Sequence, residues 1–391
     1  MRARSGPALT RRGRPATWAI VAGGGTAGHV LPGLAVARAL VAAGHRPDEI
    51  HWVGSRVGIE ARLVPEAGFG ITLLGGRGIE RRLSGASAAA ALGLAAAAVE
   101  AVVLVARHRP AVVVALGGYA SVPCALAAAL LRVPVVLCEQ NAVPGAANRL
   151  LARFARAAAV SFPGTPLPRA RVTGNPVRPE VLAVDRARDG PDAHRALGLP
   201  EGRRVVAAFG GSLGARRINL AVVSALDRWA GRGDLAVRHV VGRRDWELVT
   251  EATAAHRRQG GEPEQPGLVY APVEYEDRMD LVLAAADVAV CRAGATTVAE
   301  LAAVGLPAVL VPLPGAPGDH QTANARQLAD AGAAVVVPDV ELDGDRLAAE
   351  VDALLGDPAR LQAMAKAAAS VAHPRAAEEV AVLVEEHARR G

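Results

Sequence analysis

The chain has 391 residues, of which 51% are hydrophobic and only 3% aromatic, and its formal net charge is +6. This length exceeds that of one ordinary hydrophobic core, so we expect two domains. Five arginines and no acidic residue lie within residues 1–16, which we expect to form a disordered basic tail. The rest of the chain is nearly neutral and poor in aromatic side chains that could stack on bases, so we expect no nucleic-acid partner.

Three cysteines, Cys124, Cys138 and Cys291, are too few for a disulfide framework and fit a reduced, cytosolic protein. Their spacing suggests no metal site. The one stretch that could imitate a membrane span, Ala86 to Ala106, is mostly alanine and carries Glu100 inside it. A central carboxylate is costly in lipid, so we expect a buried crossover helix here, with contact between one of its faces and a bilayer as an alternative.

A strand, a glycine-rich turn and a helix follow the basic tail. The apolar run Thr17 to Ala22 predicts a buried strand, and the apolar spacing from Val30 to Leu40 predicts a helix. The turn between them would aim free N–H groups at the helix N-terminus into a crevice. Such a position favours a phosphate or a developing anion.

Gly23, Gly25 and Gly28 in this turn match the G-x-G-x-x-G pattern of dinucleotide-binding proteins, a weak signal when it stands alone. A dinucleotide site would add an acidic residue after the next strand, Ile50 to Gly54, to hold the ribose. Ser55 and Arg56 follow that strand instead. This disfavours an NAD-dependent dehydrogenase, the alternative from a different functional class.

Further strands are expected at 70–74, 111–116 and 134–138. The second of them ends in another glycine turn, Gly117-Gly118-Tyr119, and the third ends in Glu139-Gln140-Asn141. Open α/β sheets place their functional side chains at such carboxyl ends of strands. The glycine-rich basic segment 75–82 is expected to be a loop, and contact with an anionic substrate or lipid headgroup is its functional alternative.

The alternation starts again after a charged stretch at 179–200. Strands are expected at 204–209, 237–241, 268–271, 288–291, 308–311 and 334–336, and a third glycine turn, Gly210 to Arg216, follows the first of these. Strand–helix alternation in both halves predicts an α/β protein with two doubly wound, Rossmann-like parallel-sheet domains that face one cleft.

Two late segments have the composition of binding loops. Glycine, small residues and hydroxyls precede Glu300 in the stretch from Arg292, so a helix start there can face a pyrophosphate while Glu300 accepts hydrogen bonds from ribose hydroxyls. The loop from Pro314 to Asn324 carries amide side chains that suit the hydroxyls of a neutral sugar.

Taken in this order, the motifs resemble those of the MurG family of GT-B glycosyltransferases. The resemblance spans roughly residues 18 to 375 and is carried by seven stretches: Gly24-Gly25-Thr26-Ala27-Gly28-His29-Val30, Gly117-Gly118-Tyr119, Glu139-Gln140-Asn141, Gly174-Asn175-Pro176-Val177-Arg178, Gly210-Gly211-Ser212-Leu213-Gly214-Ala215-Arg216, Cys291 to Glu300, and Gln321 to Asn324.

The resemblance implies an inverting enzyme that moves N-acetylglucosamine from UDP-N-acetylglucosamine to the 4-hydroxyl of the muramyl sugar of undecaprenyl-pyrophosphoryl muramyl-pentapeptide, in peptidoglycan synthesis. It implies a peripheral protein on the cytoplasmic face of the cell membrane. Residues 17–178 would form the acceptor-binding domain and 179–373 the UDP-sugar-binding domain, while a helix within 374–391 would return to the first domain.

By the same resemblance, the donor would be held by Thr26, Ala27, Gly28, Asn141, Arg178, Ser212, Val273, Ala295, Thr296, Thr297, Val298, Ala299, Glu300 and Gln321. The acceptor would be held by Thr26, His29, Gly117, Gly118 and Tyr119. Val273 would contact uracil through its backbone. The chain departs from the family at Cys138, Leu213 and His320, where histidine, glutamine and glutamine are common.

The acceptor hydroxyl must lose a proton as it attacks the anomeric carbon. His29, at a cleft-facing helix start, is the expected general base, and Glu139 is the second candidate. Backbone N–H groups of the third glycine turn and of the helix at Ala295 would stabilise the leaving diphosphate, with Arg178 beside them. A single in-line displacement predicts inversion, and neither a metal nor a cofactor is expected.

Three alternative functions remain beside this sugar transfer. The chain could be a GT-B glycosyltransferase for another lipid or natural-product acceptor, a UDP-sugar epimerase, or a binding module that has kept the nucleotide cleft without its chemistry.

Overall fold

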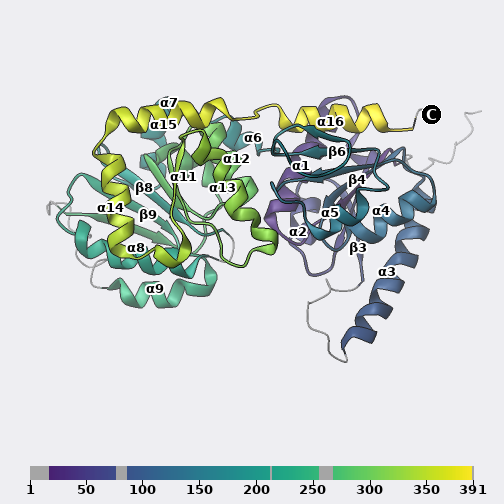
Figure 1. The fold of residues 1–391 in the computed structure, drawn as a ribbon, viewed down its shortest axis with the longest axis horizontal. Helices are drawn as coiled ribbons and strands as arrows, with labels where there is room; N and C mark the ends of the chain where they lie inside the picture. Colours follow the sequence, from purple (N-terminus) through teal and green to yellow (C-terminus); the bar gives the residue numbers. More distant parts are fainter. Residues whose placement is uncertain (1–16, 76–85, 212–213, 255–266, 390–391) are drawn as a thin grey trace, which may run out of the picture.

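The computed structural model describes residues 17–75, 86–211, 214–254 and 267–389 (Figure 1). The expected basic tail 1–16, most of the basic loop 75–82, and Ser212 and Leu213 of the third glycine turn lie outside these residues. The described chain forms two sheets whose neighbouring strands all pair in parallel.

The first sheet has seven strands in the order β3-β2-β1-β4-β5-β6-β7. The strand order reverses between β1 and β4, as in a doubly wound fold. The strands are β1 (Ala19–Gly23), β2 (Ile50–Ser55), β3 (Gly70–Leu74), β4 (Val112–Gly117), β5 (Val135–Glu139), β6 (Ala157–Val160) and β7 (Ala170–Val172). The helices are α1 (Ala27–Ala42), α2 (Glu60–Glu66), α3 (Ala86–His108), α4 (Ser121–Leu130) and α5 (Ala146–Leu151), with a 3-10 turn, η1 (Pro47–Glu49), before β2.

The second sheet has six strands in the order β10-β9-β8-β11-β12-β13, with the reversal between β8 and β11. Its strands are β8 (Arg204–Phe209), β9 (Leu235–Val240), β10 (Val269–Val273), β11 (Val288–Cys291), β12 (Ala308–Leu310) and β13 (Ala334–Val336). The helices are α6 (Pro179–Leu182), α7 (Arg186–Ala196), α8 (Arg216–Trp229), α9 (Trp246–Ala252), α11 (Met279–Ala285), α12 (Ala295–Val304), α13 (His320–Asp330), α14 (Gly344–Leu355), α15 (Pro358–Ser370) and α16 (Ala376–His387); 3-10 turns are η2 (Arg243–Asp245), η3 (Pro317–Asp319) and η4 (Asp339–Glu341). Two doubly wound parallel sheets confirm the expected fold class.

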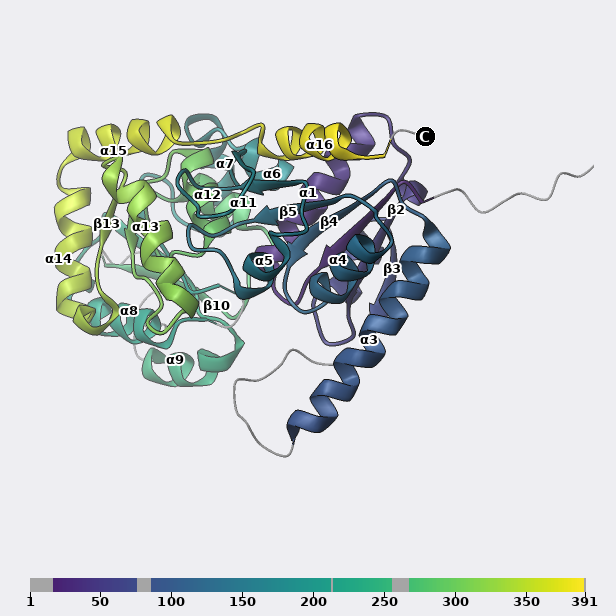
Figure 2. The ribbon, with the colours of Figure 1, turned by 45° about the vertical axis from the view of Figure 1, so that its right-hand side comes forward.

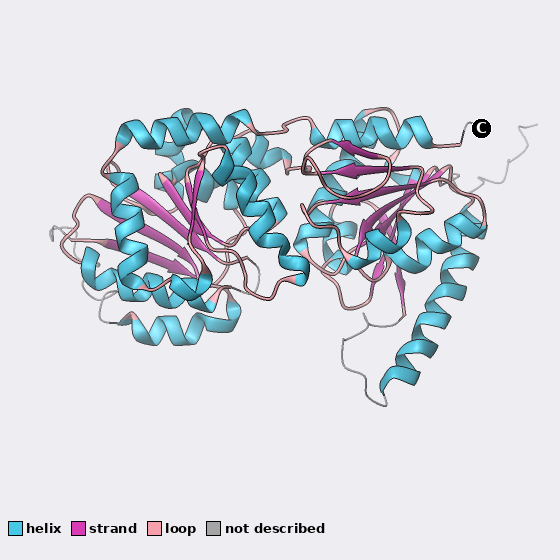
Figure 3. Cartoon of the chain, in the orientation of Figure 1, coloured by secondary structure: helices cyan, strands magenta, loops and turns pink. Residues whose placement is uncertain are grey.

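Each sheet lies between layers of helices (Figure 3), which explains why its strands are apolar on both faces. In β1, Ala19 and Val21 pack with α1, whereas Ile20 and Ala22 pack with α3 and α4 on the opposite face. The same alternation holds in β8 of the second sheet. The expected strands therefore formed wherever a short apolar run could be covered on both sides.

The C-terminal helix α16 lies on the first domain although its sequence follows the second (Figures 1 and 2). It packs against α1, β5 and β6. Val380, Leu383 and Val384 are buried in the same cluster as β1 and α1. The chain therefore crosses between the two domains twice, before α6 and before α16.

Helix α3 differs from the buried crossover helix expected from the sequence. Ala97, Ala101 and Val105 are buried against the sheet, but Val99 and Val103 on the outer face are 65% and 60% exposed. The helix runs along the edge strand β3, where no further described layer covers it (Figure 2). Among the described residues, no helix is both long and apolar enough to cross a membrane.

The close approach of α1 to the first sheet supplies a stability test at Gly33. A Cβ at this position would overlap Cδ1 of Leu116 and the ring of Trp52, both fully buried. We expect Gly33→Ala to lower the free energy of unfolding, because overpacking costs about 1–3 kcal/mol and outweighs the ~1 kcal/mol by which alanine favours a helix. Urea unfolding measures the loss. Gly231→Ala is the matched control, since a Cβ there meets nothing within 4 Å; equal unfolding midpoints for both variants would contradict the packing argument.

Candidate functional site

The carboxyl ends of the two sheets are joined by Asn324 of α13, a fully buried residue of the second domain. Its Oδ1 accepts a hydrogen bond from the N–H of Ala142 at 2.9 Å, and its Nδ2 donates to Oδ1 of Asn141 and to the carbonyl of Ala293, both at 3.2 Å. Asn141 and Ala142 follow β5, whereas Ala293 follows β11. The structure thus brings the strand ends that the sequence singles out to one boundary between the domains.

The first glycine turn joins β1 to α1, and Thr26, at the N-cap position of α1, is followed by Ala27 and Gly28 in the first helical turn. The sequence predicts that the N–H groups of this turn are free to bind an anion. For Gly25 this is wrong, because its N–H donates to Oε2 of Glu60 at 2.8 Å. Glu60 is completely buried. An acidic side chain of the protein itself therefore occupies this part of the turn.

His29 lies on the first turn of α1 and faces the second glycine turn. Its Nδ1 lies 3.2 Å from Oγ1 of Thr26, and a Cβ built on Gly117 would lie 3.2 Å from its Nε2. Burial lowers the pKa of His29 from 6.5, although the carboxylates of Glu139 and Glu60 act to raise it. The imidazole is therefore neutral at pH 7 and can accept a proton.

The second glycine turn packs directly against the first. Gly117 and Gly118 have φ angles of +93° and +78°, a region that favours glycine. A Cβ on Gly118 would lie 2.8 Å from the carbonyl oxygen of Gly24. Next in the chain, Tyr119 donates a hydrogen bond from its hydroxyl to the carbonyl of Gly75 at 3.3 Å. The residues expected to bind the acceptor thus lie along two adjoining turns.

Glu139, the second candidate for the base, ends β5 and is only 3% exposed. Its Oε1 accepts from the backbone N–H of Asn141 at 2.9 Å, and its Oε2 accepts from the N–H of Gly145 and from Nδ2 of Asn148, both also at 2.9 Å. Nδ2 of Asn141 adds a longer bond of 3.3 Å to Oε1. Both carboxylate oxygens are thus engaged in holding the loop after β5.

A cavity of about 690 Å³ lies at the carboxyl ends of β8 and β11, within the size range of small-ligand sites. Of the predicted donor residues, Thr297 and Gln321 line it; Oε1 of Gln321 also accepts from the N–H of Leu313 at 2.9 Å. The remaining lining residues come from the third glycine turn, from α8 and from neighbouring loops: Phe209, Gly210, Gly211, Gly214, Ala215, Arg216, Arg217, Leu220, Arg244, Arg292, Gly294, Leu313 and Asp339.

Two of the arginines in this cavity share one buried carboxylate. Asp245 has a fully buried side chain and accepts from Nε of Arg216 at 2.8 Å, from Arg244 at 3.1 Å, and from Nδ2 of Asn219 at 3.2 Å. Although burial acts to raise it, hydrogen bonds from Arg244 and Arg216 hold the pKa of Asp245 below its usual value. The side chains of Arg216 and Arg244 remain 57% and 51% exposed, so they present charge to the cavity.

The other two arginines, Arg217 and Arg292, are held by backbone carbonyls, and Arg292 also by Asp339. Arg217 donates to the carbonyls of Asp339 and Val340 at 2.8 and 2.7 Å. Arg292 donates to Oδ1 of Asp339 at 2.6 Å, and also to the carbonyls of Val311 and Pro312. These guanidinium groups therefore shape the wall of the cavity.

Helix α12 starts at Ala295, with Gly294 at its N-cap position, and carries Thr296, Thr297, Val298, Ala299 and Glu300. Oε1 of Glu300 accepts from both Nε and NH2 of Arg178, at 3.2 and 2.9 Å. Burial raises the pKa of Glu300, although Arg178 acts to lower it. Oε2 of Glu300 has no hydrogen-bond partner among the described residues.

Apart from Thr297 and Gln321, the described residues expected to bind the donor do not line the 690 Å³ cavity, and Arg178 and Val273 are among those that do not. Arg178, expected beside the leaving phosphate, pairs with Glu300 and lines a groove between the domains instead. Val273, whose backbone is expected to contact uracil, ends β10, and its carbonyl accepts from the N–H of Val241 at 2.9 Å. Ser212 lies outside the described residues.

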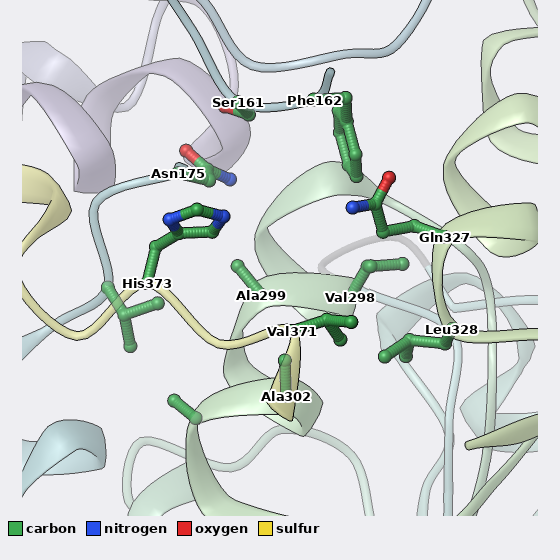
Figure 4. Close-up of a pocket in the computed structure, with 12 residues that line it drawn as sticks. Ser161, Phe162, Asn175, Val298, Ala299, Ala302, Gln327, Leu328, Val371 and His373 are labelled. Carbon is green, nitrogen blue, oxygen red and sulfur yellow. The ribbon is translucent and has the colours of Figure 1, made fainter. Parts of the chain in front are cut away.

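A smaller cavity lies where the chain crosses between the domains (Figure 4). Asn175 and His373 lie beside each other on one side of it, and Phe162 and Gln327 lie on the other. Its volume of about 30 Å³ is too small for a sugar nucleotide and is of the order needed for a water molecule or two. We therefore place the candidate site at the strand ends.

Sequence reasoning missed Glu60, Asp245 and the bridging role of Asn324. Glu60 stands six residues after the expected strand Ile50 to Gly54, a little beyond the position at which a dinucleotide site would carry its acidic residue. No sequence motif marks Asp245, because its arginine partners belong to two different elements, α8 and η2. Within the described residues, no group of three His, Cys, Asp or Glu side chains is arranged to hold a metal ion.

Comparison with known proteins places this geometry in a family. The N-terminal domain model of glycosyltransferase family 28 matches residues 19–160, and the C-terminal domain model of the same family matches residues 205–380. The crystal structure of MurG from Acinetobacter baumannii has a TM-score of 0.72 and 30% identity, and the match covers 95% of this chain and 99% of that one. A putative UDP-N-acetylglucosamine 2-epimerase from Listeria monocytogenes, with 15% identity and a TM-score of 0.66, shares the fold alone.

Two curated relatives have the same printed name, UDP-N-acetylglucosamine–N-acetylmuramyl-(pentapeptide) pyrophosphoryl-undecaprenol N-acetylglucosamine transferase. The protein from Alkalilimnicola ehrlichii is 43% identical over 371 residues, which are 95% of this chain and 99% of the relative. The protein from a Nocardioides species is 43% identical over 361 residues, which are 92% and 95% of the two chains. This chain therefore belongs to the MurG family, within glycosyltransferase family 28.

Proposed function

We propose that this protein transfers N-acetylglucosamine from UDP-N-acetylglucosamine to the 4-hydroxyl of the muramyl sugar of undecaprenyl-pyrophosphoryl muramyl-pentapeptide. The observation that carries the proposal is a neutral, half-buried His29 on the first turn of α1, together with a cavity in the second domain that glycines and half-exposed arginines line. The relatives that share 43% identity along nearly the whole chain are named for this reaction. Transfer of labelled sugar to the lipid acceptor, and to other lipid acceptors as controls, tests it.

The two domains divide the substrates. Residues 17–178, with the returning helix in 374–391, bind the acceptor at Thr26, His29 and the turn from Gly117 to Tyr119. Residues 179–373 bind the donor along the third glycine turn, Ser212 included, and along α12 and Gln321. Asn141 reaches the donor from the first domain, and its bond to Asn324 supports this placement.

The reaction is a single displacement. The acceptor oxygen forms a bond to the anomeric carbon while the bond from that carbon to the β-phosphate oxygen breaks, and Nε2 of His29 takes the hydroxyl proton. UDP leaves with the bonding electron pair, and its added charge is stabilised by N–H groups of the third glycine turn and by the N-terminus of α12. Attack opposite the leaving group inverts the anomeric centre.

Glu139 serves this reaction by positioning, because its four accepted hydrogen bonds hold the loop that carries Asn141. Oε2 of Glu300 accepts hydrogen bonds from the ribose hydroxyls, and Arg178 donates to its Oε1. We propose that UDP-N-acetylglucosamine is a substrate and that no cofactor takes part, since amides and arginines already balance the diphosphate charge.

We propose that the protein is peripheral and acts at the cytoplasmic face of the cell membrane, because its proposed acceptor is lipid-linked. The exposed Val99 and Val103 on α3, in the acceptor domain, support this location. An NAD-dependent dehydrogenase is disfavoured further by the bond between Gly25 and Glu60, which removes an N–H group that a dinucleotide phosphate would need.

Replacement of His29 separates chemistry from donor binding. We expect His29→Ala to lower kcat by about 100-fold to 10,000-fold, the usual worth of a general base, while the affinity for UDP stays unchanged. In the wild type, kcat/KM should fall as the pH drops through a value below 6.5, because burial lowers the pKa of His29 and only the neutral ring accepts a proton. Steady-state rates across pH and calorimetric titration with UDP measure both effects; a variant with normal kcat would remove His29 from this role.

Glu300 provides a test of ribose recognition. We expect Glu300→Gln to weaken UDP binding by about 10-fold to 100-fold, the range for a hydrogen bond to a charged group. The wild type should bind 2′-deoxy-UDP more weakly than UDP, and the variant should lose most of this difference. Glu350→Gln is the control, since Glu350 pairs with Arg346 on the surface of α14. If the variant still discriminates as the wild type does, Glu300 does not contact the ribose.

Arg216 and Arg244 in the 690 Å³ cavity predict that UDP binding depends on its diphosphate group. We expect Arg216→Gln and Arg244→Gln each to weaken UDP binding about fivefold to tenfold, more at low salt, and to leave uridine binding unchanged. Arg217→Gln is the matched control from the same wall, because its guanidinium is bound to backbone carbonyls. A loss of uridine and UDP affinity in equal proportion would show that Arg216 and Arg244 act only on the fold.

A further inference from the structure

The first domain contains a buried carboxylate that the proposed reaction does not use. Glu60 begins α2 and is 0% exposed. Its Oε1 accepts from the N–H of Ser55 at 2.7 Å and from Oγ of Ser55 at 3.1 Å, and its Oε2 accepts from the N–H of Gly25 at 2.8 Å. No ion pair to Glu60 is found within the part of the chain that the structure describes. The backbone N–H groups of Ser55 and Gly25, together with the hydroxyl of Ser55, therefore stabilise the negative charge of Glu60.

The surroundings are shaped around the carboxylate. A Cβ on Gly24 or Gly58 would overlap the carboxyl group of Glu60, and a Cβ on Gly54 would overlap its Cγ. These glycines come from three separate segments: the turn after β1, the strand β2, and the turn before α2. Three close backbone approaches to one side-chain group form a cradle, which we define as Gly24, Gly25, Gly54, Ser55 and Gly58.

The cradle is connected to the proposed base His29 through Thr26, the residue that follows Gly25 in the chain. Gly25, held by Oε2 of Glu60, is followed by Thr26 at the N-cap position of α1, and Oγ1 of Thr26 lies 3.2 Å from Nδ1 of His29. Without an acceptor at Oε2, the N–H of Gly25 would lose its partner and the turn would lose its anchor. The direction of His29 toward Gly117 depends on that turn.

We propose that Glu60 is a positioning residue, an internal anion seated in the cradle that fixes the turn carrying Thr26 and His29. The inference rests on the proposed function for its kinetic consequence. Glu60 takes the place that a phosphate takes at the first glycine turn of a nucleotide-binding domain. The same turn that binds a ligand in such proteins is here closed by the chain itself and serves the acceptor.

Chemical rescue tests this proposal. Glu60→Ala removes the atoms that acetate contains, so acetate fits the emptied cradle. We expect kcat of the variant to fall about 100-fold, as for a catalytic group displaced by about 1 Å, with the affinity for UDP unchanged. Added acetate should restore kcat in a saturable manner, and should raise the unfolding temperature of the variant more than that of the wild type. Acetamide, which is neutral and of the same shape, should do neither.

Glu66→Ala is the matched control, because Glu66 lies at the other end of α2 and pairs with Arg62 on the surface. It should keep the wild-type kcat and show no specific response to acetate. Normal kcat in Glu60→Ala, or equal restoration by acetate and acetamide, would overturn the proposal. Should the wild type transfer no sugar, the proposed function fails, and the acetate-dependent unfolding temperature still decides whether the cradle binds a carboxylate.

Glu60→Gln provides the measurement if the alanine variant does not fold. Glutamine keeps the volume but has only one acceptor oxygen for the two backbone N–H groups of Gly25 and Ser55. We expect kcat to fall while UDP affinity in the second domain stays unchanged. An unchanged kcat in this variant would contradict a positioning role for Glu60.

Discussion

Parallel pairing of every strand in both sheets is the constraint on which the site depends. In a parallel sheet the loops that leave the carboxyl ends of the strands lie along one edge, together with the N-termini of the helices that follow. Here the loops after β1, β4 and β5 form one such edge, and those after β8, β11 and β12 form the other. The buried amide of Asn324 holds the two edges together through Asn141, Ala142 and Ala293.

The two domains share a fold and differ in charge at these edges. In the first domain the glycine turn and the loop after β5 are each held by a carboxylate of the chain, Glu60 and Glu139, so the N–H groups of Gly25, Asn141 and Gly145 are already bound. In the second domain the glycine turn adjoins Arg216 and Arg244, which remain half exposed. A neutral hydroxyl suits the first edge and a diphosphate suits the second, which is the division that a sugar transfer from a nucleotide requires.

Burial sets the protonation state of the central group. His29 is half-buried and lies near two carboxylates, yet desolvation dominates and its pKa is lowered. Both carboxylates are saturated with hydrogen bonds from N–H groups, and for Glu60 a hydroxyl as well, so neither is available to take the proton from a substrate hydroxyl. Among the described residues, Nε2 of the His29 imidazole has no hydrogen-bond partner and lies beside Gly117 of the second glycine turn.

The sequence by itself determined the two sheets, because short apolar runs separated by glycine turns and amphipathic segments admit few other arrangements, and the expected strands at 70–74, 204–209 and 288–291 formed with those bounds. It also identified the glycine turns that the fold places at the carboxyl ends of β1, β4 and β8, since motif order is a property of the chain. Only the tertiary structure decided that α3 leaves Val99 and Val103 exposed, that Arg178 pairs with Glu300, and that Glu60 fills the first glycine turn. These facts depend on distances between segments far apart in the chain, and hydrophobic periodicity carries no information about which side chain satisfies which buried N–H group.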